Sequence, residues 1–90
     1  MNRRIESFLW LDWVVEKIEE KHGLTPEEVE EAFFNPPYKV RRSASEKYQL
    51  FGRSNSGRYL FIGFAWAEHS IKVITARDMT EAERRYYQHK

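Results

Sequence analysis

Five arginines within residues 53–85 are the side chains of this 90-residue chain best suited to chemistry. A guanidinium group stays charged at any relevant pH and binds phosphate oxygens in pairs. Aromatic residues lie among the arginines, and the bases of single-stranded RNA stack on such rings. The arginines are Arg53, Arg58, Arg77, Arg84 and Arg85, and the aromatic residues are Tyr48, Tyr59, Phe61, Trp66, Tyr86 and Tyr87. This combination favours a surface that binds RNA.

The same side chains also have ordinary structural roles. Aromatic residues on strands usually belong to a core, and we expect Tyr59 and Phe61 there. Arg77 directly precedes Asp78 at a predicted strand end, so a local salt bridge between them is an alternative to phosphate binding. Surface arginines can also serve only to keep a protein in solution.

Cleavage of RNA without a metal needs three groups: a base for the ribose 2′-hydroxyl, a cation for the phosphate and an acid for the leaving 5′ oxygen. Arginine suits the second role, and histidine, glutamate or tyrosine suits the others. His22 lies at a predicted helix end, although its place four residues after Ile18 also fits an apolar stripe. Glu46 and Lys47, at the start of a predicted strand, are further candidates.

Several other kinds of site are not indicated. The chain has no cysteine, which excludes a disulfide, a zinc-thiolate site and a cysteine nucleophile. Its histidines and carboxylates show no metal-ligand spacing, and it carries no phosphate loop, nucleophile elbow or metalloprotease motif, so we expect neither a metal nor a cofactor. No apolar run approaches the roughly 20 residues of a membrane span. The start of the chain is a poor signal peptide, and we expect a cytoplasmic protein that does not contact membranes.

Charge divides the chain into two halves. Residues 1–37 hold 4 basic and 9 acidic side chains, a net −5, and residues 38–90 hold 11 basic and 5 acidic ones, a net +6. A basic surface attracts a polyanion and an acidic one repels it. Any surface that binds nucleic acid should therefore lie on the C-terminal half, although two solvated helices rich in glutamate would give the same division.

Two helices are predicted in the acidic half. Apolar residues recur at helical spacing over residues 11–22, and Gly23 supplies a stop. Thr25 and Glu28 form a capping box around Pro26 at the first helical position. Two consecutive prolines end this second helix, because proline cannot continue the hydrogen-bond ladder.

Four strands are predicted at residues 38–42, 47–53, 58–66 and 70–77. The third is apolar on both faces, which indicates a central strand that is covered on both sides. Thr80 and Glu83 complete a capping box at the start of a last helix. The order predicts a single α+β domain over residues 1–90, with two N-terminal helices, a four-stranded antiparallel sheet and a C-terminal helix.

Four blocks of the basic half resemble the BrnT-type ribonuclease toxins of type II toxin–antitoxin systems, in the family's order and at matching spacing. The blocks are Phe51-Gly52-Arg53-Ser54, Gly57-Arg58-Tyr59-Leu60-Phe61, Val73-Ile74-Thr75-Ala76-Arg77, and Thr80 through Glu83-Arg84 to Tyr87. Lys21-His22-Gly23-Leu24-Thr25 resembles a further block, and the similarity covers roughly residues 8–87. The first helix departs from the pattern, since Val14 and Ile18 stand where the family commonly has lysine and asparagine.

The resemblance implies a RelE-like fold and cleavage of an RNA substrate that inhibits translation. It also implies a cognate BrnA-like antitoxin, which binds the toxin and represses their shared operon, so operator DNA is contacted only through the complex. The site residues that it implies are Arg53, Arg77 and Tyr87. We expect Arg77 to stabilise the phosphate and Arg53 to bind the substrate, and the base to be one of His22, Glu46 and Tyr87. Further RNA contacts are expected from Lys47, Arg58, Arg84 and Arg85.

Two other functions compete with the enzyme. One is a toxin-like binding module that associates with an antitoxin or with nucleic acid and does not cleave. The other is a protein-interaction domain anchored by Trp10, Trp13 and Trp66. Convergence of Arg53, Arg77 and a proton-transfer group on one concave face would favour catalysis, and their separation would favour binding.

Overall fold

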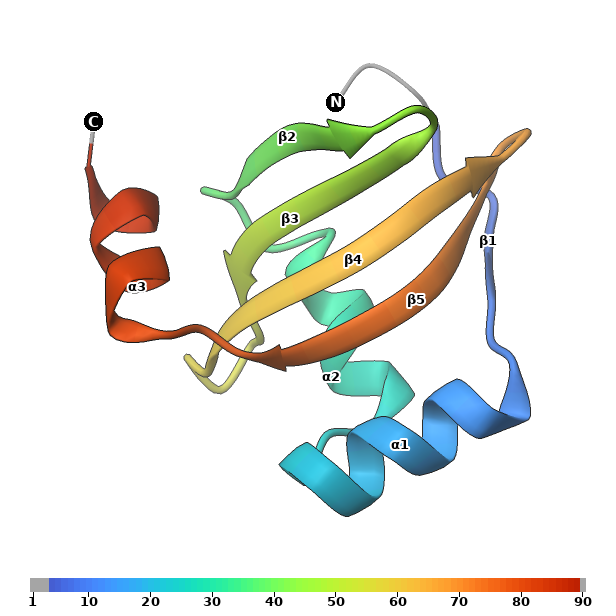
Figure 1. Cartoon of the computed structure of the whole chain (residues 1–90), viewed down its shortest axis with the longest axis horizontal. Coiled ribbons are helices and arrows are strands. Elements are labelled where there is room, and N and C mark those ends of the chain that lie inside the picture. Colours follow the sequence, from blue (N-terminus) through green and yellow to red (C-terminus); the bar gives the residue numbers. More distant parts are fainter. Residues whose placement is uncertain (1–3, 90) are drawn as a thin grey trace.

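The computed structural model describes residues 4–89, which form a sheet and three helices (Figure 1). The elements in chain order are β1 (Ser7–Leu9), α1 (Asp12–His22), α2 (Pro26–Ala32), β2 (Lys39–Ala44), β3 (Lys47–Arg53), β4 (Tyr59–Ala67), β5 (Ser70–Asp78) and α3 (Glu81–Gln88). The predicted α+β order of helices and strands is therefore confirmed. No helix of the described residues has the length and apolar character to cross a membrane.

The sheet has five strands in the order β1-β5-β4-β3-β2. The four predicted strands form an antiparallel meander, and their observed ends lie within two residues of the predicted ones. The fifth strand, which the sequence did not predict, is β1. It pairs in parallel with β5 and aligns Ser7 with Ser70. The predicted four-stranded sheet was therefore one strand short.

The helix ends follow the signals in the sequence. α1 ends at His22 and is followed by Gly23, whose φ of 61° lies in the left-handed region that glycine adopts without strain. α2 and α3 both begin with a complete capping box, in which the threonine hydroxyl accepts from the backbone of a glutamate that reaches back to the threonine amide. The glutamates are Glu28 and Glu83, as predicted.

The main core lies between the sheet and the helices α1 and α2. Leu60, Ile62 and Phe64 of β4 are fully buried there. Val14 and Ile18 of α1 are also fully buried in this core, which gives a packing reason for apolar residues at the two positions where α1 departs from the family pattern.

A second, smaller core lies on the opposite face of the sheet, under α3. Phe51, Phe61 and Met79 are its buried members, and Tyr59 and Tyr87 pack against it while keeping part of their surface exposed. The predicted cover on both faces of β4 is therefore present at Phe61, under α3, and not along the whole strand. Figure 1 shows α3 at one end of the sheet, apart from α1 and α2. It leaves the rest of this sheet face without a helix.

Candidate active site

Strand register brings the candidate residues together beneath α3. Arg53 at the end of β3 pairs with Tyr59 at the start of β4, and Phe51 pairs with Phe61 in the next position on the same face. Lys39 of β2 pairs with Phe51 on its other side. This end of the sheet therefore presents a cation and a phenol next to each other, with aromatic residues beneath the helix.

A pocket of about 440 Å³ opens between this end of the sheet and the last turn of α3. It is lined by Pro37, Tyr38, Lys39, Arg53, Tyr59, Tyr87, Gln88 and His89. Two residues of the predicted site, Arg53 and Tyr87, thus share one pocket although they are far apart in the sequence.

Tyr59 is the phenol with the most distinctive surroundings. The Arg84 guanidinium lies 4.1 Å and that of Arg53 5.8 Å from the centre of its ring. The Gln88 amide donates a hydrogen bond to its hydroxyl at 3.4 Å. The hydrogen bond from Gln88, followed by the interaction with Arg84, lowers the pKa of this phenol below its ordinary value of 10.0, and the positive charge of Arg53 acts in the same direction.

As an aromatic residue on a strand, Tyr59 was predicted to belong to the core and was not among the predicted site residues. It does pack against the second core, but it also lines the pocket. Its alternation with the buried Leu60 carried no signal of this second role, because Arg84 and Gln88 approach it only once α3 has packed on the sheet.

Tyr87 lies against Tyr59 in an edge-to-face arrangement with 5.9 Å between ring centres. Its hydroxyl donates to the backbone carbonyl of Pro37 at 2.6 Å. The proton of Tyr87 is thus engaged with the backbone, which fixes the ring beside Tyr59. Lys39 holds the end of α3 in a similar way, since its ammonium group donates to the carbonyls of Tyr86 and His89.

Arg77 lies outside this pocket and is engaged with α3. It forms two hydrogen bonds with the Glu83 carboxylate, at 2.7 and 2.9 Å, and stacks 4.2 Å from the ring centre of Phe61. These contacts lower the pKa of Glu83 and raise that of Arg77. The salt bridge between Arg77 and Asp78, which the sequence left open as an alternative, does not form: Arg77 donates to the backbone carbonyl of Asp78, and the Asp78 carboxylate binds Arg58.

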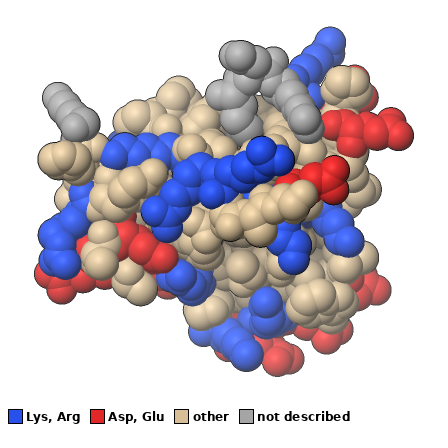
Figure 2. All heavy atoms as spheres, turned by 45° about the horizontal axis from the view of Figure 1, so that its top comes forward, with Lys and Arg blue, Asp and Glu red and all other residues tan. Residues whose placement is uncertain are grey.

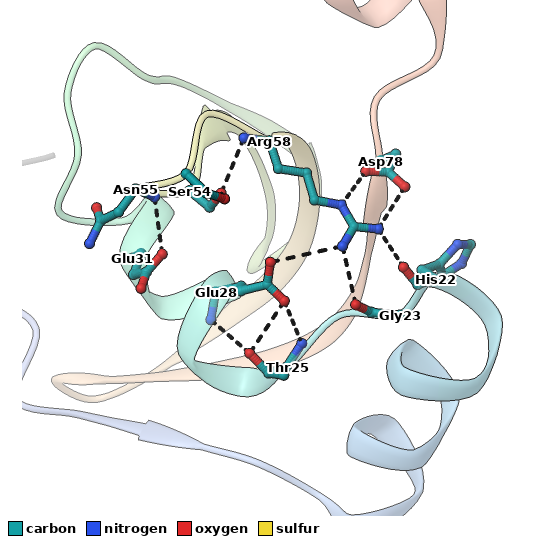
Figure 3. Close-up of polar contacts among 10 residues, drawn as sticks. His22, Gly23, Thr25, Glu28, Glu31, Ser54, Asn55, Arg58 and Asp78 are labelled. Carbon is teal, nitrogen blue, oxygen red and sulfur yellow. Dashed lines mark hydrogen bonds and ion pairs between the residues drawn. The ribbon is translucent and has the colours of Figure 1, made fainter.

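Arg58 joins four segments on the opposite side of the sheet (Figure 3). It binds both carboxylate oxygens of Asp78 at 2.7 and 2.9 Å, and it donates to the carbonyls of His22 and Gly23 at the end of α1. Glu28 of α2 lies 3.8 Å away. His22 is therefore next to this ion-pair cluster and not in the pocket beneath α3.

The remaining predicted site residues lie elsewhere. Glu46 is in the turn between β2 and β3, and Lys47 begins β3, so both are six or more residues, roughly 20 Å of strand, from Arg53. Arg85 lies on α3 and forms an exposed ion pair with Glu81 at 3.2 Å. The structure thus brings together Arg53, Arg84 and Tyr87, and separates them from His22, Arg58, Glu46 and Lys47.

The three tryptophans differ in exposure. Trp13 is 57% exposed, whereas Trp10 donates to the Glu30 carboxylate at 2.8 Å and Trp66 packs against the main core. They do not share one environment that would make a common anchor.

Basic side chains outnumber acidic ones by 11 to 5 within residues 38–90. Figure 2 shows Lys and Arg side chains across the middle of one face, with Asp and Glu mainly toward its margins. Within residues 4–89, no three His, Asp or Glu side chains lie close enough together to hold a metal ion.

Comparison with known proteins agrees with this description. The sequence matches the model of the family described as ribonuclease toxin, BrnT, of type II toxin–antitoxin system over residues 13–83. The fold is similar to the crystal structure of the Brucella abortus ribonuclease toxin BrnT, with a TM-score of 0.68, 18% sequence identity, and coverage of 83% of this chain and 97% of that chain. No curated protein matches the sequence. The family model covers well over half of the residues, and the chain therefore belongs to the BrnT family of ribonuclease toxins from type II toxin–antitoxin systems.

Proposed function

We propose that this chain is a metal-independent endoribonuclease that inhibits translation by cleaving RNA in the pocket between α3 and the sheet. The observation that carries the proposal is that Tyr59, at the wall of that pocket, has the guanidinium groups of both Arg53 and Arg84 against its ring. A phenol beside two cations ionises more readily, and the same cations attract a phosphate.

The proposed reaction uses only side chains of this site. Tyr59 accepts the proton of the ribose 2′-hydroxyl, and the 2′ oxygen attacks the neighbouring phosphorus. Arg53 and Arg84 stabilise the negative charge that develops on the phosphate oxygens. The bond from phosphorus to the 5′ oxygen breaks, and His89, which lines the pocket, supplies the proton to that oxygen. The products are a 2′,3′-cyclic phosphate and a 5′-hydroxyl.

Other residues of the predicted site support the pocket from outside. Arg77 holds Glu83 at the start of α3, and Tyr87 holds the end of α3 to Pro37. We assign both a positioning role, because each acts on α3 and so on Arg84 and Gln88. His22, Glu46 and Lys47 have no assigned part in the chemistry.

A toxin of a type II system has a cognate antitoxin. We propose that this antitoxin is BrnA-like, that it neutralises the toxin in the cytoplasm, and that operator DNA is bound only through the complex. The net charge of +6 on residues 38–90 supports RNA as the toxin's other partner.

One observation favours the alternative of a binding module that does not cleave. Arg77 lies outside the pocket that holds Arg53, and Arg77 and Tyr87 form their hydrogen bonds with Glu83 and with the Pro37 carbonyl. In this case the pocket beneath α3 would hold RNA or the antitoxin without a reaction.

Induced expression separates the two functions. The chain alone should arrest growth and degrade cellular RNA, and coexpression of the adjacent antitoxin gene should relieve both effects. Arg53→Ala should abolish both effects, whereas Lys17→Ala, on the acidic helix α1, should leave them unchanged. Growth arrest with intact RNA would support the binding module, and normal growth with intact RNA would refute the proposed activity.

A further inference from the structure

The sheet face that carries α3 continues beyond this helix into a shallow hollow of about 160 Å³. Its floor is Gly63 in the middle of β4, which pairs with Gln49 of β3 on one side and Thr75 of β5 on the other. Ser43 and Lys47 also line it. The hollow is separate from the pocket of Arg53 and Tyr59, because the two share no lining residue.

The glycine at the floor leaves the backbone of a central strand open to a ligand. Leu60, Phe61, Ile62 and Phe64 of β4 are all buried, whereas Gly63 among them is partly exposed. A glycine inside a strand weakens it and often marks a place where another group approaches closely. A methyl group at Gly63 would lie 3.1 Å from Cγ2 of Thr75, so alanine would both narrow the hollow and push against its wall.

The wall offers a fixed hydrogen-bond donor. Arg41 of β2 donates from Nε to the side-chain oxygen of Gln49 at 2.7 Å. The Gln49 oxygen is therefore an acceptor, and its amide nitrogen, with two N–H groups, is the end that can donate to a ligand. The hydroxyl groups of Thr75 and Ser43 add groups that both donate and accept.

Cations surround the hollow on the same face. Arg41 lies at its β2 side, Lys47 at its far end, and Arg77 precedes α3 on β5. Arg41 also stacks 5.0 Å from the ring centres of Phe51 and Tyr86, which holds it against the sheet. Positive charge therefore continues along β2 from Lys39, at the first pocket, to Arg41.

We infer that the hollow over Gly63 holds one unpaired base of a single-stranded RNA, with Gln49 reading an acceptor atom on its edge and Arg41 and Lys47 binding the flanking phosphates. A planar base can lie on the bare backbone of Gly63, and single-stranded RNA is read through such exposed edges. Gln49 lies four residues along β3 from Arg53, roughly 13 Å, so the base is a neighbour of the cleaved bond and not part of it. The inference rests on the proposed RNA substrate, and it adds a preference for sequence.

The test measures binding to probes that cannot be cleaved. The probes are four 2′-O-methyl oligonucleotides, each a homopolymer of one of the four bases, and they lack the hydroxyl that would attack the phosphate. Fluorescence anisotropy gives their affinities for the full chain. The wild type should prefer one base by at least about fivefold, the lower end of what one base contact provides. Gln49→Met should remove this preference, and Asn55→Ala, an amide on an exposed turn, should retain it.

A second variant probes the floor. Gly63→Ala combined with Thr75→Ser fills the hollow while removing the methyl group that the new side chain would meet. It should bind all four probes at least about fivefold more weakly and remain folded. If the wild type and the Gln49 variant bind every probe with the same affinity while RNA cleavage is normal, the base site is refuted and the proposed reaction is not. A base preference without cleavage would overturn the proposed reaction alone, and no binding to any probe would overturn the base site together with the RNA substrate.

Discussion

Replacement of Arg58 by alanine should destabilise the fold substantially, because this side chain ties four segments together. It donates to two carbonyls at the C-terminal end of α1 and to both carboxylate oxygens of Asp78. The carbonyl ends of a helix carry partial negative charge, so a guanidinium there has a favourable electrostatic interaction as well as its hydrogen bonds.

The magnitude follows from these contacts. The side chains of Arg58 and Asp78 are 30% and 53% exposed, so solvent screening limits their ion pair to about 1 kcal/mol. The two charge-assisted bonds to backbone carbonyls add roughly 1.5 kcal/mol together, since they too are only partly buried. Arg58→Ala should thus lower the free energy of unfolding by about 2.5 kcal/mol, or the melting temperature by roughly 10–20 °C for a domain of this size.

Urea unfolding followed by tryptophan fluorescence measures this change, with Arg85→Ala as the matched control. Arg85 pairs only with Glu81, and the two side chains are 69% and 86% exposed, so its loss should change the free energy by less than about 0.5 kcal/mol. Arg58→Lys keeps the charge and loses the planar fork, and it should fall between the two. A change below about 0.5 kcal/mol for Arg58→Ala would refute the structural role and restore Arg58 as a free RNA contact.

Three further changes test the fold around the site. The arginine partners of Asp78 and Glu83 lower the pKa of these carboxyls below 3.8 and 4.5. The stabilisation from these ion pairs is therefore complete above about pH 4.5 and is lost as the pH falls through the lowered pKa values. The double variant Asp78→Asn, Glu83→Gln should flatten the acid side of a curve of unfolding free energy against pH. Thr80→Ala removes the cap of α3 and should cost about 1 kcal/mol in urea unfolding, and an unchanged midpoint would contradict the capping box. Ile62→Val in the fully buried core should cost about 1 kcal/mol without altering RNA cleavage.

Local signals in the sequence predicted most of the fold. Both capping boxes, the glycine stop after α1 and the apolar alternation of β4 depend on residues close together in the chain, and the structure confirms them. β1 was missed because three residues give no periodicity, and its strand geometry comes from pairing with β5, more than 60 residues later.

The site was only partly predictable for the same reason. Arg53, Arg84 and Tyr87 carried a family pattern and do lie together. The partner of Arg77 and the role of Arg58 depend on which segments meet in space. Adjacency in the sequence suggested that Asp78 pairs with Arg77, whereas it pairs with Arg58 and Arg77 pairs with Glu83. Tyr59 alternates like any core residue, and its surroundings arise only from the packing of α3.

The central claim is that Tyr59 transfers a proton during RNA cleavage in the pocket beneath α3. The most direct measurement is the single-turnover cleavage rate of a single-stranded RNA in the presence of EDTA, with mass analysis of the ends. The wild type should leave 2′,3′-cyclic phosphate ends, and Tyr59→Phe should be slower by about 100-fold or more. Lys17→Ala, on the acidic helix α1 away from both the pocket and the hollow, should cleave at the wild-type rate. A Tyr59→Phe variant as fast as the wild type, or a wild type that needs a metal, would contradict the account.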